Sequence, residues 1–168
     1  NVVCGNYIGL DPVGENAVRN GEYGVAIQDR ASGNTIGGTQ SEARNVISGN
    51  QSDGVRLENP GTTANVVSGN YIGLDATGSF AVSNEGTGIS VTDQASRNTF
   101  GGTASGTRNY ISGNKGCGIF IDGIGTTSNV VQGNVIGLEK TGLSAVPNEN
   151  QGVVVANGAV DTLVGGTA

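Results

Sequence analysis

The sequence predicts an all-β chain that winds as a right-handed, single-stranded parallel β-helix, with about five coils and three parallel sheets around a narrow interior. Three observations predict this fold. Residues 1–64 match residues 65–128 without a gap, and residues 129–168 begin a third copy. Each 64-residue unit divides into two coils, and each coil contains three short strand patterns. We therefore expect a single β-helix segment over residues 1–168, built from repeats 1–64 and 65–128 and the partial repeat 129–168.

The internal repeat fixes the register of the whole chain. The segments NVVCGNYIGLD (1–11), NVVSGNYIGLD (65–75) and NVVQGNVIGLE (129–139) open the three copies. One glycine precedes a short β-branched run in every coil, and these glycines are Gly24, Gly54, Gly88, Gly118 and Gly152. Their spacings are 30, 34, 30 and 34 residues. Such a period is typical of a solenoid, in which each coil packs against its neighbours.

Each of the three strand patterns has one apolar face. The first follows the glycines above and alternates apolar residues with others, as at Val25 and Ile27, which indicates one inward face. The second strand follows Asn1 and its equivalents, and the third follows Asn6 and its equivalents. Isoleucine recurs at the inward position of the third strand, which predicts a core column of Ile8, Ile47, Ile72, Ile111 and Ile136. Crossovers between parallel strands favour a right-handed winding.

Asparagine recurs at the corners of the coils. It tolerates the left-handed backbone that a sharp corner needs, and stacked amide side chains can bond from coil to coil. We expect a structural ladder of Asn1, Asn34, Asn65, Asn98 and Asn129, continued by Thr162. The longer loops 12–23, 76–87 and 140–151 each contain an Ala-Val pair, so we expect them to fold back and stack two coils apart.

The composition argues against several classes of function. The chain has a net charge of −6 and no histidine, and an acidic surface repels phosphate backbones, so we expect no nucleic-acid partner. No apolar run approaches the ~18 residues of a membrane helix, so we expect no membrane span in this segment. Cys4 and Cys117 fit no metal-binding spacing and fall several coils apart, too far for a disulfide.

The motifs GNYIGLD, NTIGGT and RNVISGN resemble repeats found in large bacterial secreted and surface proteins. More broadly, the chain resembles the pectin-lyase-like superfamily of right-handed β-helices, and the resemblance covers all 168 residues. It implies an extracellular or cell-surface location. It leaves the function open, because this fold is used by lyases, hydrolases, adhesins and phage tailspikes.

Catalysis is the first chemical alternative. Hydrolases of the superfamily use clustered aspartates with a histidine, and its lyases use a calcium-binding carboxylate cluster beside a basic residue. This chain has no histidine and no Asp-Asp pair. Its closest predicted carboxylate pairs, Asp29 with Glu58 and Asp93 with Asp122, recur one repeat apart, which favours a scaffold over a unique active site. We expect no catalytic residue and no cofactor, with a polysaccharide-degrading site in the loops or outside this segment as the alternative.

Calcium is the only metal ion that the sequence suggests. Asp11, Asp75 and Glu139 occupy equivalent positions, and we expect them to alternate with Asn50 and Asn114 along the solenoid. This order keeps like charges roughly 9–10 Å apart, and the amides can donate to the carboxylates. The same oxygen-rich row could hold Ca²⁺, although the GGxGxD signature of calcium β-rolls is absent.

Carbohydrate is the remaining candidate ligand. Tyr7, Tyr71 and Tyr110 are predicted to point outward from the third strand, where aromatic faces can stack on sugars. Packing against the loops or against one another is the favoured interpretation. Arg44 and Arg108 precede this strand and could pair with the acidic rows.

These observations favour a non-catalytic structural or adhesive module of the cell surface. Terminal solenoid coils need polar caps, and open strand edges invite association. Neither end of the sequence has a recognisable cap. We therefore expect a long rod or fibre, in which the chain stacks end to end with itself or the solenoid continues into further repeats. A polysaccharide-binding or polysaccharide-degrading protein is the alternative.

Overall fold

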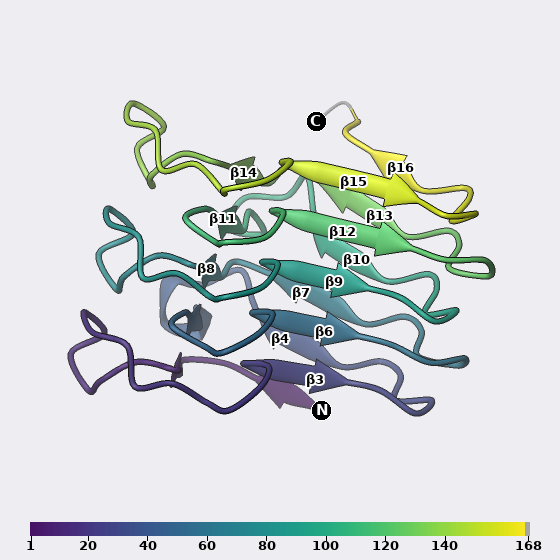
Figure 1. Ribbon diagram of the computed structural model, residues 1–168, viewed down its shortest axis with the longest axis horizontal. Helices are drawn as coiled ribbons and strands as arrows, with labels where there is room; N and C mark the ends of the chain where they lie inside the picture. The colour runs from purple at the N-terminus through teal and green to yellow at the C-terminus, as the bar shows by residue number, and fades with distance from the viewer. Residues whose placement is uncertain (167–168) are drawn as a thin grey trace.

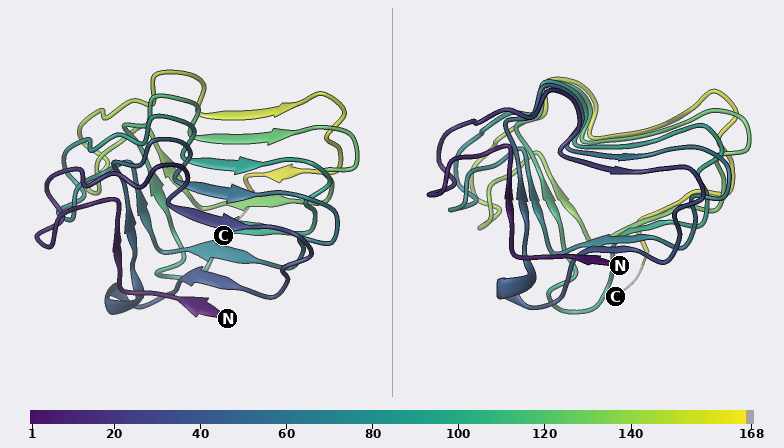
Figure 2. Two further views of the ribbon diagram at one scale, coloured as in Figure 1. Left: turned by 60° about the horizontal axis from the view of Figure 1, so that its bottom comes forward. Right: turned by 90° about the horizontal axis from the view of Figure 1, so that it is seen from below.

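The computed structural model describes residues 1–166, which form a parallel β-solenoid with about five coils. Figure 1 shows the coils stacked from the N-terminal to the C-terminal side, and the right-hand view of Figure 2 shows them superimposed along the solenoid axis. All strands pair in parallel with strands of the neighbouring coils, in three separate sheets. The predicted all-β class, the three parallel sheets and the coil count are confirmed.

The three strands of each coil contribute to three different sheets. The first sheet contains β1 (Val2–Val3), β4 (Thr35–Gly37), β7 (Val66–Ser68), β10 (Thr99–Gly101), β13 (Val130–Gln132) and β16 (Leu163–Val164). The second contains β2 (Tyr7–Ile8), β5 (Val46–Ile47), β8 (Tyr71–Ile72), β11 (Tyr110–Ile111) and β14 (Val135–Ile136). The third contains β3 (Val25–Ile27), β6 (Val55–Leu57), β9 (Ile89–Val91), β12 (Ile119–Asp122) and β15 (Val153–Ala156). A 3₁₀ turn, η1 (Ser41–Ala43), precedes β5.

The interior is filled by columns of apolar side chains. In the second sheet the register pairs Ile8 with Ile47, Ile47 with Ile72, Ile72 with Ile111, and Ile111 with Ile136, so the predicted isoleucine column is confirmed. Its three central members are fully buried. Burying each such side chain contributes about 1.5–3 kcal/mol. A continuous column therefore stabilises the coils and sets their register.

Glycine precedes the third-sheet strands because adjacent coils approach closely there. A Cβ added at Gly54 would lie 2.7 Å from the carbonyl oxygen of Gly88 and 2.7 Å from Cγ2 of Ile72. Both separations are shorter than a side chain tolerates. The glycine thus lets the isoleucine column touch the neighbouring backbone, and this requirement explains why glycine recurs before the third-sheet strands.

Asparagine ladders line three corners of the solenoid. In each ladder the amide nitrogen Nδ2 donates to Oδ1 of the asparagine in the next coil, at 2.7–3.3 Å. The ladders are Asn1–Asn34–Asn65–Asn98–Asn129, Asn6–Asn45–Asn70–Asn109–Asn134 and Asn20–Asn50–Asn84–Asn114–Asn148. All rungs run in the same direction along the chain. The predicted first ladder is confirmed over its five asparagines.

The predicted continuation of the first ladder to Thr162 is wrong. The Oγ1 atom of Thr162 is buried and makes no hydrogen bond. Asn129 keeps the bond to a backbone carbonyl of the preceding coil, that of Ala95, as Asn98 does to Thr62, but no rung from Asn129 to Thr162 is seen within residues 1–166. The threonine hydroxyl does not replace an amide that can accept from one coil while donating to another.

The expected alternation of acids with Asn50 and Asn114 is also wrong. Asn50 accepts from Asn20 and donates to Asn84, both at 2.8 Å, so it belongs to the third asparagine ladder. The predicted alignment paired Asn50 with Asp11 because both stand three residues after the isoleucine of the second-sheet strand. The long loop is inserted between that strand and the corner, and it displaces Asn20 and Asn84 along the sequence.

The long loops fold back onto the solenoid as predicted. Each begins with an antiparallel bridge, and the three bridges are Leu10 with Ala17, Leu74 with Ala81, and Leu138 with Ala145. The loops also bond to one another across the intervening coil: Ala76 N donates to Gly14 O, and Lys140 N donates to Gly78 O, both at 2.9 Å. Stacking two coils apart is therefore confirmed. In residues 1–166, no helix has the length and apolar character that would be needed to span a membrane.

The interior of an asparagine ladder should be far more sensitive to substitution than its outer end. Asn70 is fully buried, accepts from Asn45 Nδ2 at 3.0 Å and donates to Asn109 Oδ1 at 3.1 Å. Asn70→Ala leaves buried donors and acceptors unpaired, so we expect it to lower the free energy of unfolding by about 3 kcal/mol, measured from the urea midpoint. The control Asn6→Ala, at an exposed outer rung, should cost less than about 1 kcal/mol. Equal losses would contradict a role for the ladder interior.

Candidate functional site

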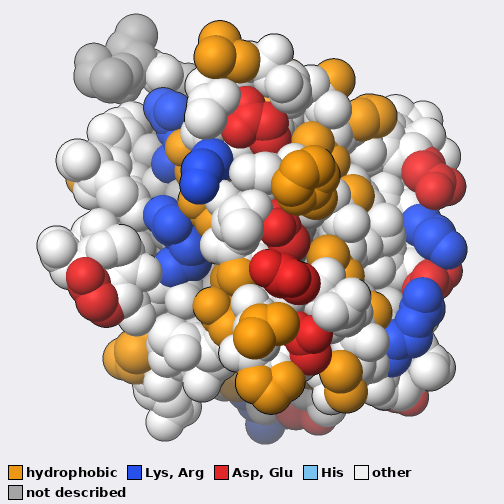
Figure 3. Space-filling model, turned by 90° about the vertical axis from the view of Figure 1, so that its left-hand side faces the viewer, with side chains coloured by type: hydrophobic (Ala, Val, Ile, Leu, Met, Phe, Trp, Pro, Cys, Tyr) orange, Lys and Arg blue, Asp and Glu red, His pale blue; other side chains and the backbone are white. Residues whose placement is uncertain are grey.

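The face formed by the long loops carries a column of acidic side chains. Figure 3 shows acidic groups running along the middle of this face, with apolar side chains beside them. Asp11, Asp75 and Glu139 each stand where a loop leaves the second sheet. The Asp75 carboxylate accepts from the backbone nitrogens of Ser79 and Phe80, at 2.8 and 3.0 Å, and so closes its loop.

The loop hydrogen bonds hold these carboxyl groups in the ionised form. Burial raises the pKa of Asp75, but donors that include the Thr77 hydroxyl outweigh it and lower the pKa overall. The hydroxyl and backbone N–H of Thr141 are the main cause that lowers the pKa of Glu139 from 4.5 to about 2. The side-chain amide of Asn16 is the largest cause that lowers the pKa of Asp11. Each carboxylate therefore has a structural role within its own loop.

The three calcium candidates lie in one column but are not gathered into a single cluster. Asp11, Asp75 and Glu139 belong to alternate coils, so neighbouring members are about 9–10 Å apart along the solenoid. Within residues 1–166, no three acidic, cysteine or histidine side chains form a group that could hold a metal ion. Backbone and side-chain donors of each loop already bond to both oxygens of its carboxylate. Calcium binding here stays a prediction.

The tyrosines mainly pack against the protein. Tyr71 is 5% exposed and meets Tyr110 edge to face, with ring centroids 5.4 Å apart. The turn at Gly78 lies against the Tyr71 ring, since a Cβ there would be 2.6 Å from it. Tyr7 is 48% exposed. The interpretation that the rings pack on loops and on one another is confirmed for Tyr71, while Tyr110 keeps an accessible side.

Arg44 and Arg108 do not pair with the acidic rows. The Nε atom of Arg44 donates to Gly69 O at 3.1 Å, and its guanidinium lies over the Tyr71 ring, 4.1 Å from the centroid. The Nε atom of Arg108 donates to Gly133 O at 3.0 Å. No ion pair to either arginine occurs in the described part of the chain. The pairing that the sequence allowed does not form, because each side chain reaches the backbone of the next coil instead.

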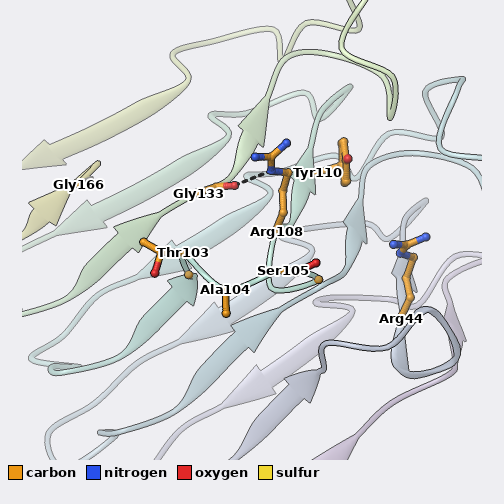
Figure 4. Close-up of a pocket in the computed structure, with 10 residues that line it drawn as sticks. Arg44, Thr103, Ala104, Ser105, Arg108, Tyr110, Gly133 and Gly166 are labelled. Carbon is orange, nitrogen blue, oxygen red and sulfur yellow. Dashed lines mark hydrogen bonds between the residues drawn. The ribbon is translucent and has the colours of Figure 1, made fainter. Parts of the chain in front are cut away.

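The two arginines border a cleft of about 430 Å³, here called the arginine cleft. Its other walls are the turn 102–106, Tyr110 and Gly133. In Figure 4, Thr103, Ala104 and Ser105 lie along one wall, and Arg108 and Tyr110 project from the other. The sequence pointed to the arginines and the tyrosine but not to the cleft. The feature of the sequence that could have indicated the cleft is the insert 103–108, which separates β10 from β11 and forms the facing wall.

The acidic loop residues should make the fold sensitive to acid. The Glu139 carboxyl has a folded-state pKa of about 2, below its usual 4.5, so its stabilising contribution is complete above pH 4.5 and is lost as the pH falls toward 2. We expect Glu139→Gln to lower the melting temperature at pH 7, with the difference from the wild type shrinking between pH 4.5 and pH 2. Thermal unfolding at several pH values measures this. The control Glu149→Gln alters an exposed side chain and should leave the profile unchanged. A constant difference at all pH values would contradict the linkage.

Comparison with known proteins adds no functional assignment. No protein-family model matches the chain, and neither the curated proteins nor the solved structures contain a match. The membership of the pectin-lyase-like superfamily thus remains a prediction from the sequence motifs. The fold itself is established as a parallel β-solenoid with stacked coils and asparagine ladders.

Proposed function

We propose that this chain is a non-catalytic structural module, a stiff solenoid rod that belongs to a long fibre on the cell surface and has an adhesive face. The observation that carries the proposal is the continuity of the three asparagine ladders through the coils. Amide rungs at three corners, together with parallel strand pairing in three sheets, join every coil to the next. Because every coil is bonded to the next at three corners and in three sheets, the segment is suited to act as a stiff spacer of fixed length.

The ionisable side chains support a structural role. Asp75 and Glu139 close loops, and Glu85 bonds Lys115 in the following coil and Arg19 two coils before it. Asp53 accepts from the backbone of Thr87 at 2.8 Å, one coil away. These carboxylates either close a loop or join one coil to another, which is what we expect of a scaffold.

The proposed partner of the rod is another solenoid coil. The outermost strands of each sheet have one unpaired backbone edge within the described residues, and such edges readily accept a further strand. We propose that adjoining coils pair there, supplied by further repeats or by a second copy. The extracellular location is proposed from the resemblance of the motifs to those of secreted and surface proteins.

A polysaccharide-binding or polysaccharide-degrading protein is the second candidate. The arginine cleft favours it, because guanidinium groups and an aromatic edge beside a hollow suit a charged sugar. Incubation with acidic and neutral polysaccharides, followed by assays for new reducing ends and unsaturated ends, separates binding from cleavage. We expect no product. Product formation that Arg108→Gln abolishes would replace the structural proposal with an enzymatic one.

The rod proposal predicts that inserting a whole repeat lengthens the molecule by two coils. Inserting a second copy of residues 65–128 after Ser128 should lengthen the particle by about 9–10 Å in small-angle scattering. It should also raise the urea midpoint, because each added coil brings new interfaces. The control inserts one coil, residues 65–97, which places unlike loops against each other and should give a lower midpoint than the full repeat. An unchanged particle length with the full repeat would contradict the proposal.

A further inference from the structure

We infer that the C-terminal end of the solenoid, at β14 and β15 (Figure 1), accepts a short-insert coil that places an isoleucine over Gly152. A short-insert coil is one like residues 34–64 or 98–128, and a long-loop coil is one like residues 1–33 or 65–97. The inference rests on the proposed rod and names the class of coil that its end takes. It excludes direct stacking of the first coil of a second copy, because that coil has a long loop.

The glycine before each third-sheet strand is explained by the coil that follows it, except at Gly152. A Cβ added at Gly88 would lie 2.7 Å from the carbonyl oxygen of Gly118, and one added at Gly118 would lie 2.5 Å from that of Gly152. A Cβ at Gly152 would meet only Cγ2 of Ile136 among the described residues, at an ordinary 3.5 Å. Its φ lies outside the left-handed region, so the backbone does not require glycine there either. The residue is thus suited to a close approach that only a further coil would make.

A recess of about 200 Å³ lies beside Gly152, and its walls come from β14 and from the segment 147–150. One coil earlier, the equivalent place is filled by an isoleucine of the following coil, since Cγ2 of Ile136 would lie 2.7 Å from a Cβ at Gly118. The isoleucine column keeps one register through the stack. A following coil would therefore place its own isoleucine in this recess and bury it.

Two asparagine ladders present donors at the same end. Inside a ladder, the backbone nitrogen and Nδ2 of each asparagine donate to Oδ1 in the next coil, as Asn114 does to Asn148 at 3.0 and 2.9 Å. Within residues 1–166, no such acceptor follows Asn134 or Asn148. The carbonyl oxygen of Asn148 also receives no N–H from this part of the chain, whereas that of Asn84 accepts from Lys115 at 3.0 Å. A coil with asparagine at both corners would supply these partners.

The long loops decide which class of coil fits. Loops that belong to coils two apart already touch, because Ala76 N donates to Gly14 O at 2.9 Å. Each long loop therefore occupies the height of two coils. A second long-loop coil placed directly on residues 129–161 would bring its loop to about 4.8 Å from the loop 140–151, in space that this loop already fills. A short-insert coil has no long loop at this position, so it avoids the overlap.

Two matched fusions test the inference by thermal unfolding. In the first, Asp161 is followed by a second copy of residues 98–128, which is a short-insert coil. In the second, Asp161 is followed by a second copy of residues 65–97, which is a long-loop coil. We expect the first fusion to melt about 2 °C or more above the wild type, because it fills the recess and pairs the open edges. The second should melt below the first, because its loop overlaps with the loop 140–151.

The substitution Gly152→Ala separates filling of the recess from other effects of added length. In the wild-type chain it should leave the melting temperature unchanged or slightly higher, because alanine restricts the unfolded chain more than glycine does. In the short-insert fusion it should lower the melting temperature by about 4 °C or more, because the methyl group meets the added coil. The control Gly118→Ala should destabilise both proteins, since a Cβ there lies 2.5 Å from the carbonyl oxygen of Gly152.

Three results would overturn the inference. The first is a short-insert fusion that melts no higher than the long-loop fusion, and the second is an equal effect of Gly152→Ala in the wild type and in the short-insert fusion. The third is sedimentation of the wild type as oligomers that Gly152→Ala dissociates, which would assign the recess to a second copy. The repeat-insertion experiment measures particle length instead. A failure here therefore leaves the rod proposal standing, and an unchanged length there would refute the rod whatever occurs at Gly152.

Discussion

The structure depends on a carboxamide that bonds to both of its neighbours at each corner. In the middle of a ladder, Asn70 accepts from the coil before it and donates to the coil after it, while its nitrogen also reaches the backbone oxygen of Ile36. A tight corner leaves backbone groups without partners in a regular sheet, and buried polar groups without partners are costly. The amides supply these partners, so strands of only two to four residues suffice for each side of the coil.

The same constraint leaves the outer surface free to vary. The inward columns and the corner amides are nearly identical from coil to coil, whereas the second sheet carries Tyr7, Val46 or Tyr71 at successive outward positions. The long loops and the shorter inserts occur in alternate coils. The arginine cleft lies where such an insertion stands beside a corner that repeats from coil to coil, so side chains can be added there without disturbing the interior.

The sequence was most informative where every coil obeys one spacing. The isoleucine column and the first ladder could be predicted because Ile47 and Asn34 keep the same offset from their strands in each coil. The third ladder was missed because the loop insertion shifts Asn20 relative to the preceding strand. Counting backwards from the following glycine would have found it, since Asn20 and Asn50 both stand four residues before that glycine. The partners of Arg44 and Arg108 could not be predicted, because a backbone carbonyl in the next coil has no signature in side-chain patterns.

The common direction of the amide rungs gives the solenoid an electrical polarity. Strand dipoles largely cancel in sheets, so the backbone contributes little along the axis. Within each ladder, Oδ1 faces the preceding coil and Nδ2 donates toward the following one. Aligned hydrogen-bonded dipoles polarise one another and sum along a chain. The N-terminal side of every ladder is therefore relatively negative and the C-terminal side relatively positive, so coils approaching in a head-to-tail sense attract each other and coils approaching head to head repel.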